Sequence, residues 1–212
     1  ALFIFTLVPE FIMRLLIWLL VHTIYRVRTV NLDSIPDTGA VVLVCNHVSF
    51  VDALVLAGSI RRPIRFVMYY KIFQIPILSF IFRTAHAIPI AASNEDPALM
   101  NQAFDRVSQA LNDGEVVCIF PEGKITDDGE LSAFKSGIQK ILERDPVPVV
   151  PLALRGLWGS FFSRRYGSAM TRFFPRGILS RIELVAGHAI DADQVSAGHL
   201  HERVLALRGN LR

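Results

Sequence analysis

Six short apolar runs, several of them rich in β-branched residues, most strongly constrain what this chain can fold into. They are separated by segments with helical periodicity or helix-start signals, including a polar one that opens at Asp96-Pro97 and stops at Gly114. Strands that alternate with helices are typical of a mainly parallel sheet covered on both faces. The sequence therefore predicts one α/β domain with a mainly parallel central sheet flanked by helices. The predicted strands cover residues 41–45, 64–68, 87–90, 116–120, 147–154 and 181–187, and the predicted helices cover 50–59, 71–82, 94–113, 136–144 and a tail from 191.

The first 29 residues differ from the rest because they are apolar and contain only four formally charged side chains, Glu10, Arg14, Arg26 and Arg28. This pattern predicts an N-terminal apolar helix that associates with a membrane, with the two later arginines at the head groups. A spanning helix, or one packed against the core or a partner, fits the same residues. A signal peptide fits poorly, because no basic segment precedes the run. We therefore divide the chain into a membrane-associating helix, 1–29, and a domain, 30–212.

Composition narrows the classes of partner. Hydrophobic residues make up 52% of the 212 residues, charged residues only 19%, and the formal net charge is +3. A weak positive charge suits phosphate groups or acidic lipid heads and does not by itself indicate nucleic acid. The two cysteines, Cys45 and Cys118, lie in predicted strands with no zinc or disulfide spacing. They are expected to be buried free thiols in a reducing compartment.

The stretch that follows the first buried strand carries unexpected polar groups. In VVLVCNHVSFVDALVLAGSI, His47 and Asp52 are five residues apart, so they can meet only if the chain bends between strand and helix. Such a turn lies at the carboxyl end of a strand, where open α/β sheets place ligand sites. A carboxylate on one imidazole nitrogen would prepare the other to act as a general base. The alternative is a capping box in which Ser49 caps the helix and Asp52 is its partner.

A second turn, Pro121-Glu122-Gly123, follows another predicted strand. Parallel neighbouring strands would bring Glu122 to the same rim as His47, although a carboxylate in a turn is often merely solvated. Lys135 lies near the start of the next helix, where a phosphate is readily held. An ordinary surface lysine explains Lys135 equally well.

Taken together, NHVSFVD, FPEG and VPVVP resemble the blocks of the glycerolipid acyltransferase family, which includes lysophosphatidic acid acyltransferases; the similarity covers about residues 30–190. The resemblance implies an O-acyltransferase in which His47 is the general base and Asp52 its partner. It also implies an acceptor-binding motif, with Glu122 near the glycerol, formed by Phe120, Pro121, Glu122 and Gly123. The acyl group would pass directly from acyl carrier protein or coenzyme A, a thioester cosubstrate, without a further cofactor.

One block departs from the family pattern. The family has Gly-x-Ile-Phe-Ile-x-Arg where this chain has HAIPIAA, so His86 stands at the glycine and Ala92 at the arginine expected to hold the acceptor phosphate. Lys124, Lys135 or Arg155 would have to replace that arginine, or the acceptor carries a larger head group. We therefore expect lysophosphatidylethanolamine as acceptor. The alternatives are a lysophosphatidic acid acyltransferase or a non-catalytic lipid-binding module.

Three longer stretches, FRTAHAIPIA, GEVVCIFPEGKIT and PVVPLALRGLWGSFFSR, are similar to a bacterial branch of the family. In that branch the acyltransferase domain is fused to a lysophospholipid transporter or an acyl-carrier-protein synthetase domain. The resemblance implies phospholipid remodelling at the cytoplasmic face of the bacterial inner membrane. The implied partners are a lysophospholipid, the thioester carrier, the membrane surface and the fused domains.

Other chemistries lack their motifs in this sequence. A GxSxG elbow, a Walker A loop and a GxGxxG turn are absent, which argues against a serine-elbow lipase and against nucleotide use. No spacing of ligands predicts a metal. A hydrolase or transacylase that uses the same base on water or on another lipid remains a rival reading.

Overall fold

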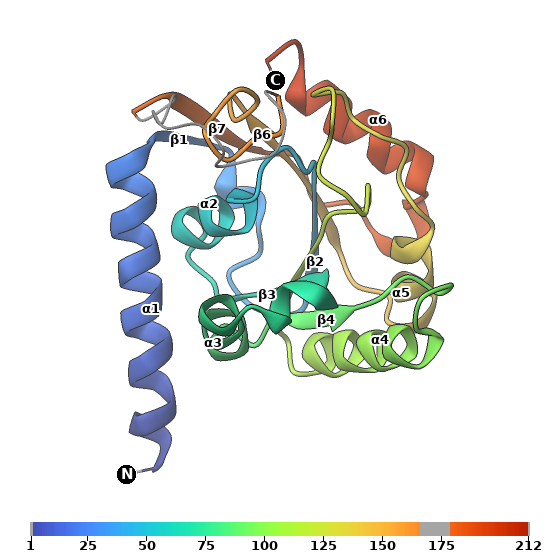
Figure 1. The fold of residues 1–212 in the computed structure, drawn as a ribbon. Helices are drawn as coiled ribbons and strands as arrows, with labels where there is room; N and C mark the ends of the chain where they lie inside the picture. Colours follow the sequence, from blue (N-terminus) through green and yellow to red (C-terminus); the bar gives the residue numbers. More distant parts are fainter. Residues whose placement is uncertain (1, 166–178, 212) are drawn as a thin grey trace.

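The computed structural model describes residues 2–165 and 179–211, which fold around a central β-sheet (Figure 1). Within these residues the sheet has seven strands in the order β1-β7-β6-β2-β5-β3-β4. The strands are β1 (Arg26–Val30), β2 (Val41–Cys45), β3 (Ile64–Tyr69), β4 (Ile88–Ile90), β5 (Val116–Ile119), β6 (Val149–Arg155) and β7 (Arg181–Ala186). The α-helices are α1 (Leu2–Ile24), α2 (Asp52–Ser59), α3 (Pro76–Thr84), α4 (Pro97–Asn112), α5 (Gly137–Arg144) and α6 (Ala197–Arg208).

The predicted α/β domain with a mainly parallel sheet is confirmed. All neighbouring strands run parallel except β6 and β7, which are antiparallel. In the registers, Val44 pairs with Ile119 and Cys45 with Leu152. The carboxyl ends of β2, β5 and β6 therefore meet at one rim of the sheet, where the polar turns were expected.

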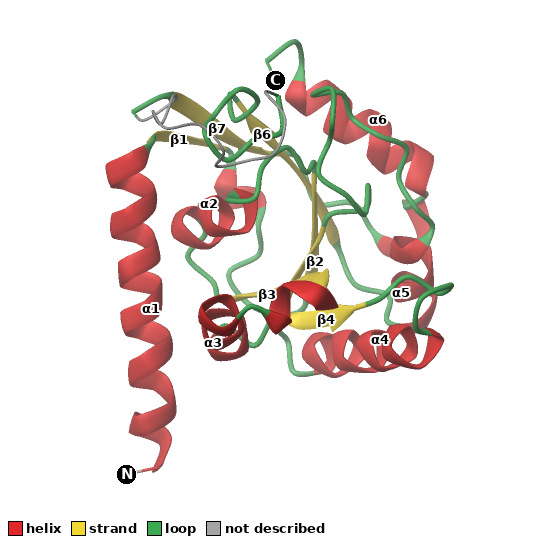
Figure 2. Cartoon of the chain, viewed as in Figure 1, coloured by secondary structure: helices red, strands yellow, loops and turns green. Residues whose placement is uncertain are grey.

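Helices cover both faces of the sheet, as Figure 2 shows. On one face α1 and α2 contribute buried side chains such as Val21 and Leu56 to a core with the strands. On the other face α4, α5 and α6 do the same, with residues such as Val107, Ile138 and Leu200. Because the central strands are buried on both faces, they read as continuous apolar runs rather than alternating ones.

Local signals explain where α4 begins and ends. The side chain of Asp96 accepts the backbone N–H of Leu99 at 2.9 Å, and Pro97 occupies the first helical position, where its missing N–H has no intrahelical partner to lose. Past the other end, Gly114 has φ +75°, a conformation that glycine adopts at little cost.

The helix predicted over 71–82 is wrong in its extent. A 3-10 helix over Tyr70–Gln74 comes first, and α3 starts only at Pro76. Ile75 is extended between them, because the ring of the following proline disfavours a helical backbone there. The connection between β6 and β7, residues 156–180, falls partly outside the described residues.

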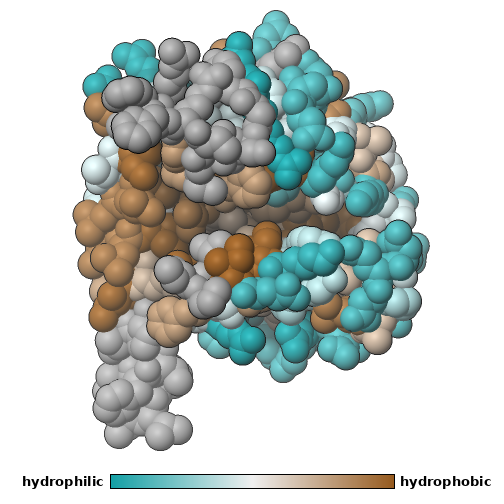
Figure 3. Space-filling model, in the orientation of Figure 1, coloured by the Kyte–Doolittle hydropathy of each residue, from teal (hydrophilic) through white to brown (hydrophobic). Residues whose placement is uncertain are grey.

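Helix α1 exists and is packed against the domain along one side. Val21 near its carboxyl end and Tyr25 just after it are buried, and the Arg14 guanidinium donates to the carbonyl oxygens of Ile60 and Arg61, which follow α2. Its other side exposes apolar residues, which Figure 3 shows as a brown area along α1: Phe11, Ile12, Leu15, Leu16, Trp18, Leu19 and Leu20. In the part of the chain that the structure describes, no helix combines the length and apolarity that crossing a membrane requires.

The arginines expected at the end of the membrane helix lie in the sheet instead. Arg26 and Arg28 belong to the edge strand β1, which pairs parallel with β7, and Arg28 forms an ion pair with Glu183 at 3.2 Å. The predicted boundary between residues 29 and 30 therefore falls inside β1. The sequence did not reveal this strand because RVRTV is short and contains two arginines, and charged residues are common on edge strands.

Candidate active site

The structure brings His47 and Asp52 together at the carboxyl end of β2. The imidazole Nδ1 lies 2.8 Å from Asp52 Oδ2; the carboxylate is buried, whereas the His47 side chain is 22% exposed. Among the described residues Nε2 has no hydrogen-bond partner. A buried carboxylate that accepts from Nδ1–H fixes the tautomer whose Nε2 is free to take a proton.

The same carboxylate also organises the turn before α2. Asp52 Oδ2 accepts the backbone N–H of Val48 at 2.7 Å and of Ser49 at 3.0 Å, while Ser49 Oγ accepts the N–H of Val51 at 3.3 Å. Ser49 is not the cap that the sequence allowed, because α2 begins at Asp52 itself and its N-cap is Val51, which makes no side-chain cap bond; the contact to the Ser49 N–H only has the form of one half of a capping box. The two readings of Asp52 are therefore compatible, since one oxygen serves both the turn and the histidine.

The ring of Phe120 stacks against the imidazole of His47. The rings of His47 and Phe120 are stacked with centroids 4.3 Å apart and 20° between planes, and Phe66 in β3 extends the stack at 6.5 Å. Three neighbouring strands, β2, β5 and β3, thus contribute to one aromatic surface at the rim. Stacking limits the rotation of the imidazole and keeps it in contact with Asp52.

Glu122 is buried next to the backbone of His47, with only 3% of its area exposed. Its Oε1 accepts the backbone N–H of His47 at 2.7 Å and its Oε2 accepts the N–H of Ser132 at 2.8 Å. Burial raises the pKa of the Glu122 carboxyl, and the two backbone donors partly oppose this effect. Both oxygens are occupied by the protein itself, so the structure places Glu122 where it holds the backbone of His47.

The rest of the FPEG turn is tightly built. Pro121 O accepts the N–H of Lys135 at 3.0 Å, and the N–H of Gly123 closes the turn on Phe120 O at 3.0 Å. Gly123 has φ +71°, and a side chain there would overlap the ammonium of Lys135, which lies directly against it. Lys135 is thus brought next to the FPEG turn by the fold.

The other two predicted cations have partners. Lys124 is exposed and pairs with Asp127 at 3.2 Å. Arg155 donates to the carbonyl of Leu207 and pairs with Glu183 at 3.1 Å. Its guanidinium therefore ties β6 to β7 and to the end of α6, and is engaged inside the fold.

Sequence reasoning missed two residues that shape the site. Asn46 is 1% exposed, and its side-chain amide bonds both the N–H and the carbonyl of Leu154, at 2.7 and 3.0 Å. This ladder-like pair joins the ends of β2 and β6. Thr126, 1% exposed, donates its N–H to His47 O at 2.9 Å. A polar residue beside a strand-end histidine was a usable signal for Asn46, but no local pattern points to Thr126.

The block that departs from the expected pattern, residues 86–92, contains β4. His86 has φ +51°, a left-handed conformation that suits the glycine expected at this position. Ala92 is exposed, and its carbonyl accepts the N–H of Glu95, whose side chain pairs with Lys71 at 3.4 Å. The position of the expected arginine thus carries a short side chain next to a carboxylate.

The two cysteines have no evident part in this chemistry. Cys45 and Cys118 are buried free thiols, as expected, and burial raises both of their pKa values. In residues 2–165 and 179–211, no three His, Cys, Asp or Glu side chains gather to hold a metal ion.

Comparisons with known proteins agree with this geometry. The family model described as Acyltransferase matches residues 26–155, a range that begins at β1 and includes every predicted site residue. The chain is 32% identical over 149 residues to a chloroplastic 1-acyl-sn-glycerol-3-phosphate acyltransferase of Arabidopsis thaliana, covering 69% of this chain and 41% of that protein. It is 28% identical over 131 residues to the 1-acyl-sn-glycerol-3-phosphate acyltransferase of Bacillus subtilis, covering 61% of this chain and 63% of that one.

Among solved structures, the 1-acyl-sn-glycerophosphate acyltransferase PlsC from Thermotoga maritima superposes with a TM-score of 0.68. The match covers 86% of this chain and 70% of that chain at 19% identity, so it supports the fold alone. The chain spans less than half the length of the Arabidopsis relative, so what the whole relative does is not transferred to it directly.

Proposed function

Because this chain belongs to the acyltransferase family, we propose that it transfers a fatty acyl group from a thioester to the free hydroxyl of a lysophospholipid. The observation that carries this proposal is the 2.8 Å contact between His47 Nδ1 and the buried Asp52 carboxylate. The contact leaves Nε2 as the nitrogen that can accept a proton at a partly open position. An imidazole prepared in this way is suited to general-base catalysis.

In the proposed reaction Nε2 of His47 takes the proton of the acceptor hydroxyl as its oxygen attacks the thioester carbonyl carbon. The tetrahedral intermediate then collapses, the carbon–sulfur bond breaks, and the new ester is released. His47 returns its proton to the departing thiolate. Asp52 stabilises the imidazolium between these steps through the hydrogen bond at Nδ1. The acyl group passes directly, so the enzyme needs no nucleophile of its own.

The first candidate acceptor is lysophosphatidic acid, 1-acyl-glycerol 3-phosphate. The names of the Arabidopsis and Bacillus relatives favour it over the head-group-bearing acceptor that the sequence led us to expect. The ammonium of Lys135, which lies against the turn at Gly123, supplies a cation for the acceptor phosphate. Lys124 has a weaker claim because Asp127 pairs with it, and Arg155 because its guanidinium is engaged.

The second candidate acceptor is lysophosphatidylethanolamine, and the loop after β4 favours it. Ala92 stands where an arginine would clamp a phosphomonoester, and the charged side chains of the neighbouring Glu95 and Lys71 are paired with each other. An ethanolamine head group carries an amine that a carboxylate attracts. The two acceptors therefore differ in head-group charge, and the loop after β4 is where this chain departs from the family pattern.

The donor in this proposal is an acyl thioester of acyl carrier protein or coenzyme A, and no other cofactor takes part. We propose that the reaction takes place at the cytoplasmic face of a bacterial inner membrane, in a protein that fuses this domain to a lysophospholipid transporter and an acyl-carrier-protein synthetase. The outward side of α1 supports contact with lipid, since residues such as Phe11 and Leu16 are 69% and 60% exposed. Helix α3, which contacts α1, adds Phe80 at 72%. An apolar surface of this kind suits insertion into the head-group region.

The decisive experiment supplies the purified chain with an acyl thioester and each lysolipid in turn, and separates the lipid products by chromatography. Thioester-dependent formation of the diacyl product supports the proposal, and the ratio of kcat/KM values selects the acceptor. Release of free fatty acid alone would indicate a hydrolase, and product formed from lipid without thioester a transacylase. Lysolipid binding with no turnover would indicate a non-catalytic module.

A further inference from the structure

Arg208, in the last turn of α6, is a buried charge with no part in the proposed reaction. It is 6% exposed; its Nη1 donates to Gly129 O and its Nη2 to Glu130 Oε2, each at 3.0 Å. Removing a guanidinium from water is costly, and a surface-facing partner such as Glu130 returns only part of that cost. Both acceptors lie in one loop, residues 122–132, which begins at the FPEG glutamate.

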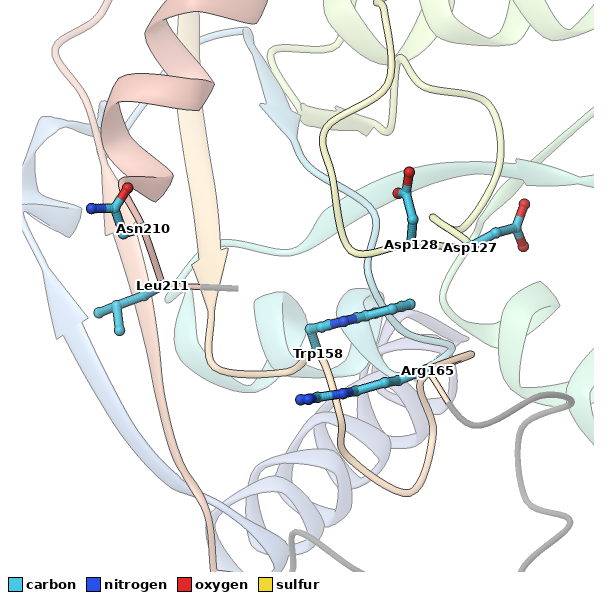
Figure 4. A pocket seen from close by; sticks show the side chains of 6 residues that line it. All are labelled: Asp127, Asp128, Trp158, Arg165, Asn210 and Leu211. Atoms are coloured by element: carbon cyan, nitrogen blue, oxygen red, sulfur yellow. The ribbon is translucent and has the colours of Figure 1, made fainter.

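This loop is packed on a second side by Trp158. Gly129 has φ +83°, and a side chain there would overlap the indole nitrogen of Trp158. Figure 4 shows Trp158 with Arg165 stacked on one face and Asp128 beside the other, in a pocket that Asn210 also lines. Loop 122–132 is therefore enclosed between Trp158 and the end of α6.

Hydrogen bonds connect loop 122–132 to both the backbone N–H and the backbone carbonyl of His47. The N–H of Gly129 donates to Thr126 Oγ1 at 3.0 Å, and the N–H of Thr126 donates to His47 O at 2.9 Å. At the ends of the loop, Glu122 joins the N–H groups of Ser132 and His47. A shift of Gly129 would therefore reach the histidine through one residue, Thr126.

We propose that Arg208 is a positioning residue: it holds loop 122–132 in the conformation that fixes the backbone of His47, and α6 thereby completes a site built on β2 and β5. The effect of Arg208 on catalysis rests on the proposed function, whereas its role in holding loop 122–132 does not. Misplacement of a catalytic group by about 1 Å typically costs on the order of 100-fold in rate. A bond that merely attaches α6 to the domain would not change the geometry of His47.

The test compares Arg208→Met, which keeps the length and loses the charge, with Arg208→Lys, which keeps the charge and cannot bond both acceptors in the same way. Arg203→Met is the control, since Arg203 is exposed on the same helix and bonds only His199 among the described residues. Hydrogen exchange measured by mass spectrometry then reports on peptides that cover 122–132. We expect exchange there to accelerate about tenfold or more in Arg208→Met, less in Arg208→Lys, and not in Arg203→Met.

Kinetics of the folded variants supply the second readout. We expect kcat of Arg208→Met to fall roughly 10- to 100-fold with KM for the thioester nearly unchanged, and Arg208→Lys to recover part of the loss. Thr126→Val removes the hydroxyl that accepts the Gly129 N–H. It therefore breaks the same chain of contacts while Arg208 keeps both of its acceptors. It should accelerate exchange at Gly129 and lower kcat in the same manner.

Unchanged exchange in folded Arg208→Met would overturn the holding role, and faster exchange with unchanged kcat would overturn the positioning role. If the wild-type chain transfers no acyl group to any lysolipid, the proposed function fails. The exchange measurement then still decides whether Arg208 holds the loop.

Discussion

The carboxylate of Glu122 accepts the backbone N–H of His47 at 2.7 Å across 75 residues of sequence. The two motifs that the sequence placed on one rim are thus joined directly, and the glutamate of one supports the histidine of the other. Glu122 was expected near the glycerol of the acceptor, whereas in the structure both of its oxygens accept backbone N–H groups. The two backbone donors favour the carboxylate form of Glu122, and the larger effect of burial opposes them.

Glu122 should make stability depend on pH in a definite direction. Burial raises the pKa of this carboxyl in the folded state, so the folded chain binds the proton more readily than the unfolded chain. The stabilisation of the folded state that this carboxyl contributes is present below the ordinary glutamate pKa. It is lost as pH rises through the raised pKa of the folded state. The free energy of unfolding of wild type, relative to Glu122→Gln, should therefore fall across this window and then level off. Denaturant unfolding at a series of pH values measures it, and a difference that rises with pH would contradict the assignment.

Asp52→Asn tests whether the carboxylate serves the histidine or only the turn. An amide no longer stabilises the imidazolium, so kcat should fall by about 10³- to 10⁴-fold, the order seen when a triad aspartate is replaced. Ser49→Ala is the matched control, because it removes the Ser49 Oγ contact to Val51 and leaves the contact to His47. Loss of this one turn hydrogen bond should cost about 0.5–1.5 kcal/mol of stability with nearly normal turnover. A folded Asp52→Asn with normal turnover would assign Asp52 to the helix start alone.

The sequence predicted the parts of the fold that local pattern encodes. The buried strands β2, β5 and β6 were evident because parallel central strands are apolar throughout, and the strand ends then located His47 and Glu122. The antiparallel direction of β7 and the edge strand β1 were not predictable, since pairing depends on chain segments far away. The partners of Glu122 were hidden for the same reason, because a backbone N–H leaves no mark in the sequence.

Ala92→Arg tests whether the loop after β4 selects the acceptor. An arginine at this exposed position would offer a phosphomonoester a bidentate contact, which a lone lysine does not provide. We expect kcat/KM for lysophosphatidic acid to rise relative to lysophosphatidylethanolamine by about tenfold. Competition of the two acceptors for one thioester donor measures the ratio. An unchanged ratio would mean that this loop does not reach the acceptor phosphate.

The outward side of α1 should bind lipid. Because Val21 and Tyr25 are part of the core, point changes on the exposed side are a cleaner test than deletion of the helix. Phe11→Asn with Leu16→Asn should reduce the fraction bound to anionic vesicles several-fold and lower activity on bilayer lipids more than on short soluble analogues. Leu205→Asn is the control, since Leu205 is 40% exposed on α6, which covers the opposite face of the sheet. Equal vesicle sedimentation of all variants would exclude α1 as the lipid-binding surface.

His47→Ala tests the central proposal most directly, because the substitution removes the base and leaves the backbone contacts of the turn. The backbone contacts of residue 47 to Glu122 and Thr126 do not involve its side chain, so the fold should persist, and circular dichroism verifies this. The measurement is the initial rate of thioester-dependent lysolipid acylation by equal amounts of folded wild type and variant. General-base catalysis predicts that His47→Ala is slower by at least about 100-fold. A folded His47→Ala that acylates the lysolipid at nearly the wild-type rate would contradict it.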